Sequence, residues 1–161
     1  MNISRSTYPM LLAFCMGAMT AAAEVVLTTE VTKVQRFANA AGEVETRFVD
    51  ATEVIPGDEL RYTISFSNEG DQPVDAESVV ITNPIPENTV YLEGTAFGAG
   101  TRITFSVDGG GNFGDPDQLN VTREGLERPA IAEDYTTIRW VFEPELAPGE
   151  KSYVSFNVRL K

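Results

Sequence analysis

A strict alternation of apolar and polar residues after Pro56-Gly57 limits this chain to few folds. The alternating residues are Leu60, Arg61, Tyr62, Thr63, Ile64, Ser65, Phe66 and Ser67. A period of two, carried by β-branched and aromatic side chains, predicts a β-strand with one face in a core. The same design follows Pro148-Gly149, where Val154, Phe156, Val158 and Leu160 alternate with polar residues. Two such strands in one chain predict an antiparallel β-sandwich.

Other β-capable runs, separated by turn residues, fill most of the remaining chain. They cover residues 25–34, 44–50, 74–82, 90–92, 103–107, 118–122 and 135–143. Segment 124–134, which contains Pro129, is predicted to be a surface loop. Short strands at this spacing, without a helical period after residue 23, predict an all-β sandwich of about eight or nine strands. The predicted core comprises Leu60, Tyr62, Ile64, Phe66, Val79, Ile81, Phe105, Ile138, Trp140, Phe142, Val154, Phe156 and Val158.

Residues 1–23 have the features of a secretory signal peptide. Arg5 supplies positive charge, residues 10–18 are mainly apolar, and Ala21-Ala22-Ala23 offers a cleavage site. The apolar stretch is too short to span a membrane. The alternative is a lipoprotein anchored through Cys15, although Phe14 stands where a lipobox has a small residue. The protein is expected to be exported to the periplasm, the cell surface or the medium, with no membrane span after cleavage.

Residues 24–161 are expected to form one domain without the usual catalytic side chains. The chain has no histidine, and its single cysteine, Cys15, lies in the predicted signal peptide. The usual zinc ligands and the serine–histidine and cysteine–histidine couples are therefore missing. Glu143 and Glu145 could act as an acid–base pair, but nothing in the sequence raises the pKa of one of them. We expect no enzyme and no catalytic residues.

The chain is strongly acidic. It has 24 acidic and 12 basic residues, for a net charge of −12. Phosphate backbones and anionic membrane surfaces repel such a protein, so nucleic acid is excluded as a partner and membrane binding is disfavoured. The charge is interpreted as a means of keeping a secreted β-protein soluble and its sheet edges apart, with cation binding as the alternative.

Three segments together resemble the module known as domain of unknown function 11. They are Val54-Ile55-Pro56-Gly57-Asp58 with the strand that follows, the run from Val79 through Pro84-Ile85-Pro86 to Tyr91, and Leu146-Ala147-Pro148-Gly149-Glu150 with the last strand. The resemblance covers about residues 50–161. It implies an immunoglobulin-like β-sandwich found in bacterial and archaeal surface and secreted proteins, with roles in spacing, adhesion or assembly. The family has no agreed catalytic residues, and this chain holds a single copy.

A glycine-rich acidic loop contains the only candidates for a metal site. Ser106-Val107-Asp108-Gly109-Gly110-Gly111-Asn112-Phe113 resembles the Asp-box hairpin of sialidases, in which the aspartate accepts turn N–H groups. Asp108, Asn112, Asp115 and Asp117 could instead supply oxygen ligands to Ca²⁺, although their spacing is not that of an EF-hand. A solvated acidic loop is the structural interpretation of the same residues.

Two functions follow as hypotheses. The first is a non-catalytic exported module that acts by protein–protein contact, with an envelope or extracellular protein, or another copy of itself, as partner. The alternative is a small secreted carbohydrate- or Ca²⁺-binding protein. The segment 25–34 bears on assembly, because a terminal strand can pair with its own sheet or with the edge of a neighbour. Pairing within its own sandwich is the preferred expectation.

Overall fold

The computed structural model describes residues 24–161, so the predicted signal peptide and Cys15 lie outside the described residues. This part of the chain is all-β, with eleven strands and two short 3₁₀ helices. The strands are β1 (Val25–Ala38), β2 (Val44–Asp50), β3 (Glu59–Asn68), β4 (Val79–Pro84), β5 (Thr89–Tyr91), β6 (Phe97–Gly98), β7 (Thr101–Ser106), β8 (Asn120–Arg123), β9 (Leu126–Pro129), β10 (Thr137–Phe142) and β11 (Lys151–Leu160). The helices are η1 (Pro116–Gln118) and η2 (Ala132–Asp134), and neither is long enough to cross a membrane.

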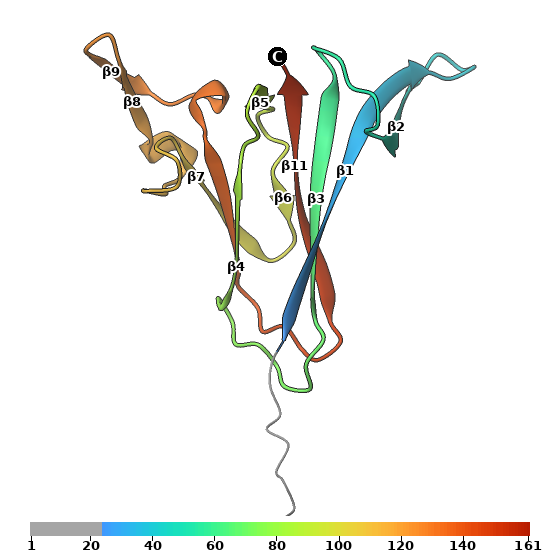
Figure 1. The fold of residues 1–161 in the computed structure, drawn as a ribbon, viewed down its shortest axis with the longest axis vertical. Coiled ribbons are helices and arrows are strands. Elements are labelled where there is room, and N and C mark those ends of the chain that lie inside the picture. The colour runs from blue at the N-terminus through green and yellow to red at the C-terminus, as the bar shows by residue number, and fades with distance from the viewer. Residues whose placement is uncertain (1–23) are drawn as a thin grey trace, which may run out of the picture.

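The strands form two antiparallel sheets and a separate hairpin (Figure 1). The larger sheet has the order β2-β1-β3-β11-β5, with β6 also paired to β11. The smaller sheet has the order β4-β10-β7, and β8 pairs only with β9. The predicted antiparallel β-sandwich is confirmed, with slightly more strands than the sequence predicted.

Aromatic contacts show which strands of the two sheets face one another. The rings of Phe66 on β3 and Phe142 on β10 are 5.3 Å apart, centroid to centroid. Trp140 on β10 lies 5.9 Å from Phe156 on β11. Tyr91 on β5 lies 5.4 Å from Phe105 on β7. Strand β10 therefore covers β3 and β11, β7 covers β5, and β4 is the edge of the small sheet on the side of β3 and β1.

The predicted core is confirmed at twelve of its thirteen positions, including Trp140, whose side chain is fully buried. The exception is Tyr62, which is half-buried and stacks on Phe156 with ring centroids 5.1 Å apart. Tyr91, Tyr135 and Leu146 also belong to the core, although the predicted core did not include them. A single core thus holds both sheets together.

Two turns of identical design start the strands β3 and β11. In each, proline precedes a glycine with positive φ, +93° at Gly57 and +74° at Gly149. The acidic residue that follows closes the turn, because Asp58 Oδ2 accepts from the Ile55 N–H and Glu150 Oε2 accepts from the Ala147 N–H. Proline at the second and glycine at the third position specify a type II turn. Because only glycine adopts positive φ freely, each turn fixes where its strand begins.

Residues 124–134 lie mainly at the surface, as predicted, but they are not an irregular loop. The segment contains β9 and η2, and its last residue, Asp134, is buried. Glu124 and Gly125, both with positive φ, form a tight turn that folds β9 back onto β8. The apolar content of this segment is too low to predict a strand, and contacts of Asp134 with Arg123 and Arg128 hold it instead.

Candidate functional site

The glycine-rich loop is an ordered turn built around Asp108. Asp108 Oδ1 accepts from the Ser106 hydroxyl at 2.6 Å and from the Asn112 N–H at 3.0 Å. Its Oδ2 accepts from Asn112 Nδ2 at 2.7 Å. These hydrogen bonds hold the pKa of Asp108 well below its usual range, and the bond from the Ser106 hydroxyl has the largest effect. The side chain thus closes its own turn, as the resemblance to an Asp-box implies.

The four predicted Ca²⁺ ligands are brought together only in part. Asn112 lies against Asp108, whereas Asp115 precedes η1 and Asp117 lies within it, both exposed to solvent. Within residues 24–161, no group of three or more histidine, cysteine, aspartate or glutamate side chains is placed to hold a metal ion. Binding of Ca²⁺ through Asp108 would require its oxygens to be shared with, or released from, the turn. The Ca²⁺ site stays a prediction.

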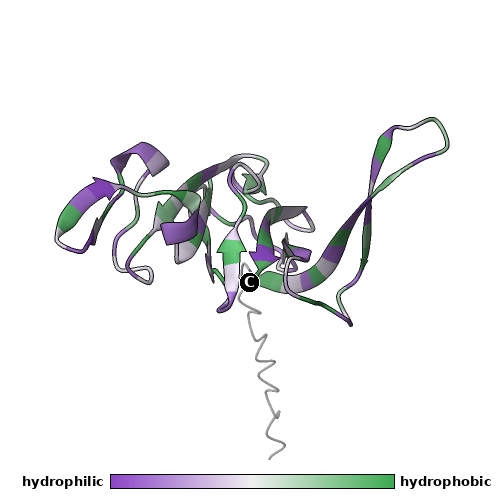
Figure 2. Ribbon diagram, turned by 90° about the horizontal axis from the view of Figure 1, so that it is seen from above, coloured by the Kyte–Doolittle hydropathy of each residue, from purple (hydrophilic) through white to green (hydrophobic). Residues whose placement is uncertain are grey.

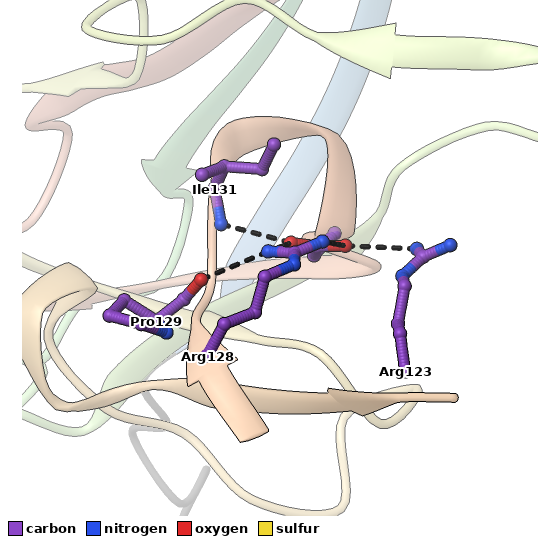
Figure 3. Close-up of polar contacts among 5 residues, drawn as sticks. Arg123, Arg128, Pro129 and Ile131 are labelled. Atoms are coloured by element: carbon purple, nitrogen blue, oxygen red, sulfur yellow. Dashed lines mark hydrogen bonds and ion pairs between the residues drawn. The ribbon is translucent and has the colours of Figure 1, made fainter. Parts of the chain in front are cut away.

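A buried carboxylate, missed at the sequence level, anchors the β8–β9 hairpin (Figure 3). Arg128 forms a two-pronged contact with Asp134, with N–O distances of 2.7 and 3.0 Å. Arg123 donates to the same carboxylate at 2.9 Å, and the Ile131 N–H donates at 3.0 Å. The side chain of Asp134 is only 2% exposed. Its contact with Arg128, the strongest influence, lowers the pKa of Asp134 to about 2.

A hollow of about 360 Å³ beside the core contains the aromatic residues relevant to carbohydrate binding. Tyr91, Phe105 and Tyr135 line it, together with Glu93. The rings of Phe105 and Tyr135 are stacked with centroids 4.6 Å apart, and all three aromatic residues are more than nine-tenths buried. The rings therefore pack on one another, and little of any ring face is open for stacking on a sugar.

Exposed apolar side chains also lie on a long hairpin, here called the projecting hairpin, formed by residues 35–47 of β1 and β2 and the turn between them. Strand β1 pairs with β3 only as far as Val34, and beyond this point it pairs with β2 alone. Phe37 is 37% exposed and Val44 71% exposed, and Phe48 at the base is 48% exposed. Figure 2 shows this hairpin extending away from the sandwich, on the side opposite β8–β9.

Ion pairs hold the base of the projecting hairpin to the sandwich. Arg36 donates through both terminal nitrogens to Glu59, at 2.5 and 3.0 Å. Asn157 Nδ2 donates to the same carboxylate at 2.7 Å, and Lys33 pairs with Asp58 at 2.6 Å. Glu59 is only 7% exposed, and its contact with Arg36 lowers the pKa of the carboxyl group. These contacts fix the direction in which the hairpin leaves the sheet.

Two arginines lie over the aromatic rings of the same hairpin. The guanidinium carbon of Arg47 is 4.9 Å from the ring centroid of Phe37, and that of Arg61 is 5.1 Å from the ring centroid of Phe48. Both distances are within the range of a cation–π contact. The register places Phe37 on one face of the hairpin and Val44 and Phe48 on the other, so each face combines a partly exposed aromatic ring with an arginine. The sequence alternation around Val44 and Phe48 predicted the strand without predicting its exposure.

Comparison with known proteins gave no match to a protein-family model, to a curated protein or to a solved structure.

Proposed function

We propose that this chain is a non-catalytic exported module that acts by protein–protein contact at the cell envelope or outside the cell. The observation that carries the proposal is the projecting hairpin, which holds Phe37 and Val44 away from the core, with Phe48 exposed at its base. An apolar side chain that is exposed alone is ordinary, but several on one projecting element are typical of an interaction surface. The resemblance to domain of unknown function 11 supports the same proposal.

The composition of the hairpin favours a protein partner over a small molecule. Aromatic residues and arginine are enriched at protein interfaces, where rigid rings bury a large area with little loss of side-chain entropy. Arg47 over Phe37 provides this combination on a convex element. Small-molecule sites are concave, so a projecting hairpin does not suit them. The ion pair of Arg36 with buried Glu59 further reduces the entropy that a partner must overcome.

Binding of purified residues 24–161 to an envelope fraction of the source cells tests this proposal. We expect saturable binding that the double substitution Val44→Ser with Phe48→Ser abolishes. Leu126→Ser is the matched control, because Leu126 is 74% exposed on the β8–β9 hairpin, away from the proposed surface. Equal binding of the double variant and the wild type would refute the role of the hairpin. Hydrolysis of a glycan, peptide or ester panel that point substitutions remove would refute a non-catalytic function.

A further inference from the structure

The smaller sheet is one strand too narrow to cover the larger sheet. Strand β10 packs over β3 and β11, and β7 over β5, so β4 is the last strand before β1. Leu27 of β1 pairs with Phe66 of β3 and therefore faces the same side of the sheet. Phe66 is 1% exposed, whereas Leu27 is 50% exposed. A strand added beside β4 would lie over β1 and bury this row.

The exposed edge of β4 lacks the charges that the edge strands β2 and β7 carry. Its sequence, Val-Val-Ile-Thr-Asn-Pro, contains no charged residue, and Val80 is 50% exposed. The outer strand β2 carries Glu45, Arg47 and Asp50. The edge strand β7 carries Arg102, and part of its edge is covered where Phe105 and Gly114 exchange two backbone hydrogen bonds. Natural proteins protect their edges with charge, cover or proline. In β4 the single such device is Pro84 at its end, which leaves the stretch from Val79 to Asn83 open.

The phase of the β4 ladder shows which backbone groups are free to pair. The Glu143 N–H donates to the Gly100 carbonyl, so the odd-numbered residues of β10 bond toward β7. The even-numbered residues of β10 therefore bond toward β4, where their partners are Val79, Ile81 and Asn83. The N–H and C=O groups of Val80 and Thr82 consequently point away from the sheet. They are the groups that a further strand would use.

The charge around this edge indicates the chemistry of the partner. Strand β4 begins at the end of the sandwich where the β3–β4 and β10–β11 loops meet, joined by the bridge between Val74 and Leu146. The exposed carboxylates of these loops are Glu69, Asp71, Asp75, Glu77, Glu143, Glu145 and Glu150. Two of these carboxylates are paired with cations, Glu69 with Lys151 and Glu143 with Arg102. A cationic segment is complementary to this end, whereas a second copy with its own net charge of −12 is not.

We propose that an extended, basic segment of another protein adds to the free edge of β4 as a fourth strand of the small sheet, with its apolar side chains on Leu27 and Tyr62. Main-chain hydrogen bonds to Val80 and Thr82 supply register, and the row on β1 supplies side-chain selectivity. This inference rests on the proposed function, because it names a second surface of the same interaction module and the kind of partner that fits it.

The probe is a blocked synthetic peptide of about six residues, the usual length of a strand, in which valine alternates with lysine. Binding is measured by fluorescence anisotropy, and amide exchange reports protection of Val80 and Thr82. Thr82→Pro removes one outward N–H and leaves the bonds to β10 intact, because residue 82 does not bond toward β10. Thr46→Pro is the matched control. The Asn39 N–H donates to the Glu43 carbonyl, so the odd-numbered residues of β2 bond toward β1, and the Thr46 N–H points away from the sheet at the outer edge of β2.

We expect binding with protection of both amides, a loss of about tenfold in affinity with Thr82→Pro, and no change with Thr46→Pro. Leu27→Asp, at an exposed site, gives a second variant in case Thr82→Pro does not fold. The proposal would be overturned if the peptide did not bind, or if neither Thr82→Pro nor Leu27→Asp weakened its binding. It would also be overturned if a peptide with glutamate in place of lysine bound with equal affinity. A dimer of this chain that Thr82→Pro dissolves would also overturn it, because the occupant would then be a second copy. Envelope binding that persists without peptide binding would refute this inference alone.

Discussion

Replacing Asp134 by asparagine tests whether one carboxylate holds the β8–β9 hairpin to the sandwich. The change removes the charge that accepts three hydrogen bonds from Arg123 and Arg128, and keeps an oxygen for the Ile131 N–H. The pKa of Asp134 is lowered to about 2 from the ordinary value of 3.8, which corresponds to about 2 kcal/mol of stability. Because the two arginines are 67% and 38% exposed, water screens part of this, and we expect a loss of about 1–2 kcal/mol.

The contribution of Asp134 to the unfolding free energy should depend on pH in a defined direction. A carboxyl group whose pKa is lowered by folding stabilises the folded state above its unfolded pKa. That contribution is lost as the pH falls through the folded pKa. The difference in unfolding free energy between wild type and Asp134→Asn should therefore be full at pH 7 and shrink between about pH 4 and pH 2. A difference that stayed constant over this range would refute the reasoning.

Urea unfolding provides the assay, with the fluorescence of Trp140 as the signal, since this single tryptophan is fully buried in the core. Glu133→Gln is the control for loss of a negative charge next to the site, because Glu133 is exposed and belongs to the same short helix. We expect this control to unfold as the wild type does. If both variants lost equal stability, general charge rather than the contacts of Asp134 would be responsible.

Three further outcomes can be measured on the same domain. Leu146→Ala removes a fully buried side chain and should lower the unfolding free energy by about 2–5 kcal/mol in urea titrations, while a loss below about 1 kcal/mol would contradict its place in the core. Arg36→Ala removes the main partner of Glu59, so the pKa of Glu59 should rise in a carboxyl ¹³C titration; an unchanged titration would contradict the contact. Asp108→Ala should speed amide exchange at Asn112, whose N–H donates to that carboxylate, and exchange unaltered from wild type would show that the turn does not need it.

Much of the fold could be predicted because its strands alternate and its turns have specific chemistry. Leu60, Ile64 and Phe66 share one face, and the Pro-Gly turns fix the starts of β3 and β11. The first strand also pairs within its own sheet, as expected, since β1 bonds to β3 along ten residues. Val79 and Ile81 are buried as predicted, whereas Val80 between them is exposed because β4 lies at a sheet edge and its outer face is open. Sequence alternation cannot report which strand lies at an edge.

The features that sequence could not predict depend on contacts between distant segments. Tyr91 and Leu146 lack alternating neighbours, and only the closing of the two sheets buries them. The arginines that bind Asp134 lie in a polar stretch, and polar residues at the sequence level favour solvent. The projecting hairpin shows the converse, since an alternating run predicts a strand but not whether another layer covers it. Such outcomes depend on the tertiary arrangement, which propensity and period do not contain.

The arrangement of β1 and β11 on either side of β3 also sets the mechanical behaviour of the domain. Glu24 lies beside Glu69 at one end of the sandwich, and Lys161 lies beside Asn88 at the other, as Figure 1 shows for the C-terminus. Both strands run in the same direction, and each is antiparallel to β3. A pull between Glu24 and Lys161 would therefore load both ladders in shear, along the strands, so that many hydrogen bonds must break together. The domain should resist stretching in this direction far better than peeling from the projecting hairpin, where the bonds between β1 and β2 would open one pair at a time.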